Sequence, residues 1–106
     1  LPEMYRDAFY PRSLVERIHL EMKLVADLLE EGERDPLLVQ FRFDKMAIEI
    51  NHLQPLFLEQ QSALDYFAKE AIASTIERMI EHYELPINLS EALRYWEYAS
   101  LERYSA

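Results

Sequence analysis

The sequence has no cysteine and only one glycine, Gly32, and these two shortages exclude several classes of protein. Without cysteine there are no disulfide scaffolds, thiolate zinc sites or thiol nucleophiles. β-Rich folds need many tight turns with positive φ, which glycine adopts at little cost. Phosphate-binding loops need glycine because their backbone approaches the ligand closely. We therefore expect neither a β-rich fold nor a P-loop or dinucleotide-binding fold.

The sequence also lacks long apolar runs and positive charge. No apolar segment approaches the roughly 20 residues of a membrane-spanning helix, and we see no signal-peptide pattern. We therefore expect a cytoplasmic protein that does not bind membranes. Acidic residues outnumber basic ones by 20 to 11, which gives a net charge of −9. Affinity for nucleic acid comes largely from cationic contacts to phosphate, so this charge argues against a nucleic-acid ligand and favours a basic protein partner.

Half of the residues are hydrophobic, and their spacing follows a helical period. Leu14, Ile18 and Met22, for example, recur at steps of four, which places them on one face of a helix. The same pattern predicts helices over residues 12–30, 36–52, 63–83 and 89–103, after a short lead-in over 1–11. Short connections favour antiparallel neighbours. The predicted fold is all-α: a four-helix antiparallel bundle, or a five-helix one if the lead-in is counted, in a single domain over 1–106.

Local signals mark where these helices begin and end. Gly32 is placed to end the first helix, since glycine is the usual residue just past a helix C-terminus. Asp35 followed by a proline is typical of a helix start, and Pro55 disfavours helical geometry just before it. Ser62 and Asn88 each precede an acidic residue by three positions, which is the spacing of a capping box. We therefore expect these two residues to start the third and fourth helices.

The second predicted helix is apolar on two sides, which is typical of a central helix with neighbours on both. At 100° per residue its apolar residues form two arcs. The arcs are Leu37, Leu38, Phe41 and Ile48 on one side, and Val39, Phe43, Met46, Ala47, Ile50 and Leu53 on the other. Between the arcs lies a polar seam of Arg42, Lys45, Glu49 and His52. Two interpretations stay open: the seam is a buried network or ligand-facing strip, or its charged ends reach solvent between two neighbouring helices.

Two Glu-x-x-His motifs, Glu16 to His19 and Glu49 to His52, have the i, i+3 spacing used by carboxylate-bridged metal bundles. Glu16 lies nearly opposite the apolar face of its helix, so it should point to water. A metal centre needs several ligands converging inward, and only the second motif lies close to an apolar arc. We therefore expect no metal site, no cofactor and no catalytic residue. A small metal- or ligand-binding bundle built on Glu49 and His52 is the alternative.

Two acidic surfaces are candidates for binding a partner. The first is the outer face of the last predicted helix, where Glu91, Tyr95, Tyr98 and Glu102 fall within about 60° of each other. Tyrosine is enriched at protein interfaces because it buries a large area and still offers a hydroxyl. The second surface is the first loop, which carries Glu30, Glu31, Glu33 and Asp35. An ordinary solvated surface is the competing interpretation of each.

The opening segment EMYRDAFYPRSLVER resembles the start of an uncharacterised bacterial family, a domain of unknown function whose members are short, acidic and helical. The family has a pattern similar to M-Y-x-D-x-Y-F-P followed by L-V. The corresponding residues here are Met4, Tyr5, Asp7, Tyr10, Pro11, Leu14 and Val15, with Phe9-Tyr10 where the family has Tyr-Phe. A second set, similar to the family's third helix, comprises Ser62, Ala68, Glu70, Ile72 and Ala73. The middle segment FDKMAIEINHLQPLFLEQQ departs from the family pattern. The resemblance implies a helical fold and carries no established function.

Small size, strong acidity and the absence of a catalytic constellation favour a non-enzymatic protein-interaction module. Its most concrete form is an immunity or antitoxin-like protein that inhibits a basic partner protein by electrostatically steered binding. The alternatives are the metal- or ligand-binding bundle and a regulatory protein whose partner is not basic. The oligomeric state is left open, as is whether the apolar corner of Leu56, Phe57 and Leu58 is buried within the chain or against a second copy.

Overall fold

The computed structural model describes residues 1–96, which form five α-helices. Their bounds are α1 Pro2–Arg6, α2 Arg12–Glu30, α3 Pro36–Glu59, α4 Tyr66–His82 and α5 Leu89–Ala92. No strand occurs among the described residues, and the predicted all-α bundle is confirmed. The lead-in contains one short helix, α1, as the five-helix version of the prediction requires. In this part of the chain no helix has the length and apolar character needed to cross a bilayer.

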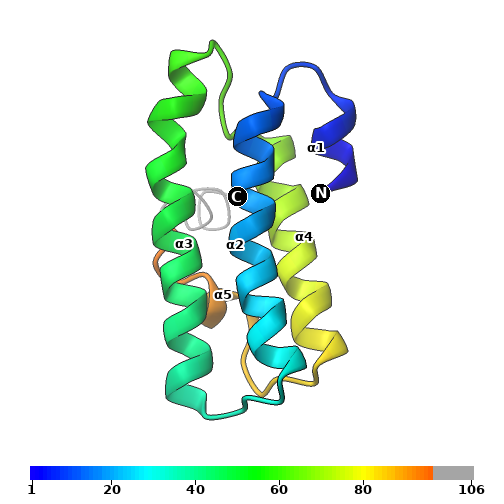
Figure 1. The fold of residues 1–106 in the computed structure, drawn as a ribbon, viewed down its shortest axis with the longest axis vertical. Helices are drawn as coiled ribbons and strands as arrows, with labels where there is room; N and C mark the ends of the chain where they lie inside the picture. The colour runs from blue at the N-terminus through cyan, green and yellow to red at the C-terminus, as the bar shows by residue number, and fades with distance from the viewer. Residues whose placement is uncertain (97–106) are drawn as a thin grey trace.

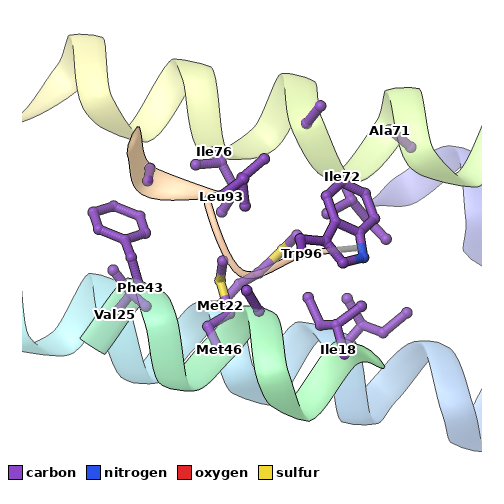
Figure 2. Close-up of a cluster of buried hydrophobic side chains, with 14 of the residues drawn as sticks. Ile18, Met22, Val25, Phe43, Met46, Ala71, Ile72, Ile76, Leu93 and Trp96 are labelled. Atoms are coloured by element: carbon purple, nitrogen blue, oxygen red, sulfur yellow. The ribbon is translucent and has the colours of Figure 1, made fainter. Parts of the chain in front are cut away.

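Three long antiparallel helices, α2, α3 and α4, make up the body of the bundle (Figure 1). α2 and α3 pack side by side as a hairpin, and α4 and α5 lie on one side of this pair (Figures 1 and 2). α1 packs against α2 and α4. The loop between α2 and α3 and the end of α4 consequently lie at the same end of the bundle (Figure 1).

A single hydrophobic core fills the space between the α2–α3 pair and α4. Figure 2 shows Phe43 and Met46 of α3 on one side of this space and Ile72 and Ile76 of α4 on the other. Trp96 enters between them from the segment after α5, and only 1% of it is exposed. The last described residue therefore closes the core.

Two of the predicted helix starts have the predicted caps. Asp35 caps α3, where its side chain accepts a hydrogen bond from the backbone N–H of Leu37 at 2.9 Å. Asn88 and Glu91 form the capping box that begins α5. In both cases a side-chain oxygen satisfies an N–H that has no partner within its own helix.

α4 begins later than the capping pattern predicts, because Asp65 rather than Ser62 is its N-cap. The side chain of Asp65 accepts from the backbone N–H of Ala68 at 3.0 Å. Ser62 belongs instead to the turn after α3, where its backbone N–H donates to the carbonyl of Phe57 at 2.9 Å. Its side chain is buried there, and its Oγ has no hydrogen-bond partner.

All three long helices end in the same hydrogen-bonded turn. The residue just past the C-cap has positive φ, and the next N–H bonds to a carbonyl five residues earlier, which is the Schellman arrangement. Gly32 takes the positive-φ position after α2, with φ 95°, as predicted. Gln61 and Glu84 take it after α3 and α4, with φ of 58° and 53°. Left-handed backbone costs a residue with a Cβ roughly 1–2 kcal/mol, so the last two turns are strained and the first is not.

α3 continues past Pro55, so the helix end predicted at residue 52 is wrong. Proline in a helix interior cannot donate to the carbonyl four residues earlier, and its ring crowds that carbonyl. The helix persists because Leu53 and Phe57, which are 2% and 0% exposed, hold its last turns against the core. The apolar corner is divided as a result: Phe57 is buried within the chain, whereas Leu58 is 58% exposed.

α5 is a single turn, so the helix predicted over 89–103 is too long within the described residues. Side chains of α3 donate to two carbonyls in and just after α5, and the carbonyl of Glu91 also accepts from the backbone N–H of Arg94 at 3.4 Å. The amide of Gln40 donates to the carbonyl of Glu91 at 2.8 Å, and the amide of Asn51 donates to the carbonyl of Tyr95 at 2.7 Å. In a continuing helix the carbonyl of Glu91 would accept from the backbone N–H of Tyr95, four positions later. α3 thereby ends α5 and turns the chain toward the core.

The outer side of α3 is exposed, so the prediction of a central helix with neighbours on both sides is wrong for the described residues. The arc that contains Phe43, Met46 and Ile50 is buried in the core. The other predicted arc points away from α4, with exposed fractions that run from 80% at Leu37 to 37% at Ile48. An apolar surface therefore remains on the outside of the α2–α3 pair.

Candidate protein-interaction site

The first-loop acidic surface predicted from the sequence lies between α2 and α3 and is held in shape by its own hydrogen bonds. The carboxylate of Glu33 accepts from the backbone N–H groups of Arg34 and Asp35 at 3.1 and 3.0 Å. The carboxylate of Asp35 in turn caps α3. Glu31 is exposed at the C-cap of α2. The backbone that begins α3 therefore fixes two of the four predicted carboxylates.

The structure brings the end of α4 against this loop. The hydroxyl of Tyr83 donates to the carboxylate of Glu30 at 2.5 Å. The guanidinium of Arg34 lies 5.6 Å from the centre of the Tyr83 ring, within the range of a cation–π contact. The same guanidinium donates to the carbonyls of Leu29 and Glu33 at 2.9 and 2.7 Å. One tyrosine and one arginine thus join the loop to α4.

We call the resulting region the acidic end. Its acidic members come from the end of α2 and the loop after it, and from the end of α4 and the turn after it: Glu30, Glu31, Glu33, Asp35, Glu81 and Glu84. All of them except Glu33 are exposed. Arg34 is the one arginine within the loop, and backbone carbonyls and the Tyr83 ring occupy its guanidinium. The acidic end therefore presents concentrated negative charge at one end of the bundle.

The contacts of Tyr83 in the acidic end make its hydroxyl harder to ionise, because they raise its pKa overall, although Arg34 acts in the opposite direction. The hydrogen bond to Glu30 raises the pKa of the Tyr83 hydroxyl, and burial and the negative charge of that carboxylate raise it further. A neutral hydroxyl can donate to the carboxylate, whereas a tyrosinate would repel it. Tyr83 therefore acts as a donor that positions Glu30.

The second predicted surface is not assembled as one face of a helix. Glu91 lies in α5, where it completes the capping box. Tyr95 lies past the end of α5, and 52% of it is exposed. Tyr98 and Glu102 lie outside the described residues. Only half of the predicted set can therefore be placed, and its two members belong to different local structures.

A cation that the sequence analysis did not include lies beside Tyr95. The guanidinium of Arg94 is 5.0 Å from the centre of the Tyr95 ring. It also donates from Nε and a terminal nitrogen to the two carboxylate oxygens of Asp44, at 3.0 and 2.7 Å. This surface is consequently less acidic than predicted, and the acidic end is the stronger of the two candidates.

The two Glu-x-x-His motifs do not converge on a site. The carboxylate of Glu16 accepts from the hydroxyl of Tyr5 at 2.7 Å. Glu49 pairs with Lys45 at 3.6 Å along α3. The histidines of both motifs are exposed. Within residues 1–96 no three histidine, aspartate or glutamate side chains lie close enough together to hold a metal ion.

The polar seam of α3 contains one ion pair to α2 and one ion pair within α3, and its fourth member, His52, is exposed. Arg42 lies 3.4 Å from Glu21 of α2, with 23% and 20% of the two side chains exposed. Burial raises the pKa of the Glu21 carboxyl, and the charge of Arg42 partly offsets this effect. Lys45 and Glu49 make the second pair. The first pair therefore ties α3 to α2 beside the core, and the second lies along α3.

Sequence reasoning identified the loop carboxylates and missed the residues that connect them to α4. Tyr83 is the last residue of the third predicted helix, over 63–83, and Arg34 is the single basic residue in an acidic loop. The sequence therefore offered two signals: a basic residue among acidic ones, and a tyrosine at the end of a helix. In an antiparallel bundle the third helix ends where the second begins, so the topology itself places Tyr83 beside this loop.

Comparison with known proteins identifies the family to which the chain belongs. Neither a curated protein nor a solved structure shows significant similarity to this chain. A family of unknown function, DUF5713, matches residues 1–98. This agrees with the resemblance to an uncharacterised domain of unknown function that the sequence suggested. The chain therefore belongs to the DUF5713 family, a family of unknown function.

Proposed function

We propose that this protein is a non-enzymatic, cytoplasmic protein-interaction module that binds a basic partner protein through its acidic end. Its most concrete form is an immunity or antitoxin-like inhibitor that covers a cationic surface of a toxic partner. The observation that supports this proposal is the junction of Glu30, Arg34 and Tyr83, which joins carboxylates from two separate segments into one charged surface.

The proposed binding rests on two physical effects: long-range electrostatic attraction of the partner, and contact with a preorganised surface. Concentrated charge of one sign raises the association rate of an oppositely charged partner, and salt weakens this effect. The loop carboxylates are positioned by backbone N–H groups and by Tyr83 before any partner arrives. Less conformational entropy is then lost on binding. Inhibition follows because the partner's cationic surface is occupied.

The test is to capture the partner with the immobilised chain from cells that encode both proteins and then to measure binding with the purified pair. We expect a basic protein whose association rate falls several-fold as NaCl rises from about 50 to about 300 mM. Co-expression with the chain should suppress any toxicity of that protein. A captured protein that is acidic or neutral, or binding that salt does not weaken, would show that the proposal is wrong.

A matched pair of double variants locates the surface. Glu31→Gln with Glu84→Gln removes two charges from the acidic end, and Glu3→Gln with Glu59→Gln removes two charges elsewhere. We expect the first pair to slow association several-fold and the second pair to change it little, because steering depends on charge near the contact. Equal effects of the two pairs would mean that only the net charge matters and that the acidic end is not the site.

A further inference from the structure

The outside of the α2–α3 pair carries six large apolar side chains that are exposed. Its large apolar residues are Leu20 and Leu24 of α2 and Leu37, Leu38, Phe41 and Ile48 of α3, and we call this set the outer face. Each of them is between 37% and 80% exposed. Exposed apolar side chains are ordinary when they are scattered singly, whereas a contiguous set marks a surface that another molecule covers.

Helix geometry places the six residues on one side of the pair. Leu20 and Leu24 are one turn apart on α2, nearly opposite its buried stripe. Phe41 and Ile48 share a stripe on α3 opposite the buried arc that contains Phe43. Because α4 and α5 lie on the other side of the α2–α3 pair (Figures 1 and 2), both stripes point away from the core.

The two stripes are adjacent because α2 and α3 run antiparallel in close contact. The 3.4 Å ion pair between Glu21 and Arg42 shows that these two residues lie at about the same height along the two helices. Leu24 lies one turn past Glu21 on α2, and Leu38 lies one turn before Arg42 on α3. These two leucines therefore lie at similar heights on neighbouring helices, which makes the outer face continuous across the pair.

The charge of the outer face differs from that of the whole molecule. The chain carries a net charge of −9. Between the apolar stripes, however, Glu21 pairs with Arg42 and Lys45 pairs with Glu49, at 3.4 and 3.6 Å, and the positive charge of Arg17 also lies near Glu21. A basic partner would gain little attraction here and much more at the acidic end. Two copies of this chain repel each other over most of their surfaces, and they can meet with least repulsion where the charge is balanced.

The size of the outer face also suits a second copy. α3 has 24 residues and is therefore about 36 Å long. Two adjacent helices, each about 10 Å wide, present on the order of 700 Å² over that length. A standard stable interface buries about 800 Å² on each partner. Two such faces packed across a two-fold axis would form a four-helix layer, which is the usual way for amphipathic helices to bury a second apolar face.

We propose that the outer face is a homodimer interface, in which the α2–α3 pair of one copy packs against the α2–α3 pair of a second copy. This assigns a partner to the arc of α3 that the fold leaves exposed. It is independent of the acidic end, which lies in the loop and at the end of α4, outside the outer face.

The first experiment is sedimentation velocity on the full chain from about 1 to about 100 μM, a range that spans the affinities of ordinary interfaces. We expect the mass to double with rising concentration. We expect Phe41→Ser to raise the dimer dissociation constant at least about tenfold, because truncating a large aromatic residue at an interface centre has an effect of this size. Tyr66→Ser is the matched control, since Tyr66 and Phe41 are 62% and 64% exposed but only Phe41 lies on the outer face.

The effect of salt on binding distinguishes this proposal from the proposed function. Raising NaCl from about 20 to about 300 mM shortens the screening length and so reduces the repulsion between two acidic copies. We expect the dimer to become tighter, whereas binding of a basic partner at the acidic end becomes weaker. A chain that dimerises and finds no basic partner supports this inference and contradicts the proposed function, and the reverse result does the opposite.

Three outcomes overturn the proposal. The first is a dimer that Phe41→Ser does not weaken, because the contact then lies elsewhere. The second is a chain that stays monomeric at about 100 μM and binds the apolar dye ANS in a way that Phe41→Ser reduces, because the outer face is then open for a different partner. The third is a monomer that binds no dye, because other residues of the same chain then cover the face.

Discussion

Ser62 and Asp65, three positions apart between α3 and α4, differ in how their side-chain oxygens are satisfied. Asp65 holds the start of α4 and also accepts from the hydroxyl of Tyr10 at 2.5 Å. Ser62 matches the sequence pattern of a cap, yet its hydroxyl is buried without a partner. A buried polar group without a hydrogen bond is destabilising by about 1–3 kcal/mol.

The first prediction concerns Ser62→Ala. Removing the unpartnered hydroxyl should leave the free energy of unfolding unchanged or raise it by up to about 1 kcal/mol. If Ser62 were a cap, the same change would lower it by about 1 kcal/mol. Urea denaturation followed by circular dichroism measures the sign, and Asp65→Ala, which must be destabilising, is the control. A Ser62→Ala variant as unstable as Asp65→Ala would contradict the structure at this turn.

The second prediction concerns Tyr10 at high pH. Burial, the hydrogen bond to Asp65 and the charge of that carboxylate raise the pKa of the Tyr10 hydroxyl well above its ordinary value. The unfolded chain therefore loses this proton first, near pH 10. Stability from this group is complete below about pH 10 and is lost as the pH rises further, by up to about 1.4 kcal/mol per pH unit.

Tyr10→Phe provides the comparison for this prediction. The variant should be less stable by about 1 kcal/mol below pH 9, because Asp65 loses a donor. Above about pH 10 its free energy of unfolding should fall less steeply than that of the unsubstituted chain. The two proteins share every other ionisable group, so the difference between the two curves isolates Tyr10. Parallel curves would mean that Tyr10 keeps an ordinary pKa.

At the scale of elements, the parts that the sequence predicted are those governed by neighbours along the chain. Gly32, the cap at Asp35 and the capping box at Asn88 are all local signals, and the structure has all three. The continuation of α3 through Pro55 and the early end of α5 depend on burial of Phe57 and on the amide of Asn51. These are long-range contacts that periodicity does not contain. Likewise, the loop carboxylates could be predicted, and their junction with Tyr83 required the packed bundle.

The third prediction uses the shortage of glycine at helix ends. Gln61 stands at φ 58° just past α3, so Gln61→Gly should relieve strain and raise the free energy of unfolding by about 1 kcal/mol. Gln60→Gly is the matched control, because Gln60 has φ −100° and gains nothing from glycine's freedom. That variant should be neutral or less stable, since glycine increases the entropy of the unfolded chain. Equal changes in the two variants would contradict the left-handed conformation of Gln61.

At the scale of the whole molecule, charge opposes compactness. A net charge of −9 is confined within a molecule of 40 × 30 × 20 Å. At about 0.01 M salt the Debye length is about 30 Å, so most carboxylates repel each other across the bundle. At about 0.15 M it is about 8 Å, which leaves only near neighbours. The exposed pairs, such as Lys23 with Asp27 at 3.0 Å, contribute little in either condition.

The fourth prediction is that raising NaCl from about 0.01 to about 0.15 M raises the melting temperature by a few degrees, because screening reduces the net repulsion. The measurement is best made on Phe41→Ser at low concentration, so that self-association does not contribute. A fall in melting temperature would show that the local ion pairs outweigh the net repulsion.

The buried position of Trp96 has a consequence for the folding of an incomplete chain. α2 and α3 can pair as soon as both have been synthesised, but the space between this hairpin and α4 is filled by an indole that follows every long helix (Figure 2). A chain that ends before residue 96 therefore lacks the side chain that covers the apolar surfaces of α3 and α4 facing the core. Chaperones and proteases recognise exposed apolar surface, so we expect a chain truncated before residue 96 to be degraded or to aggregate.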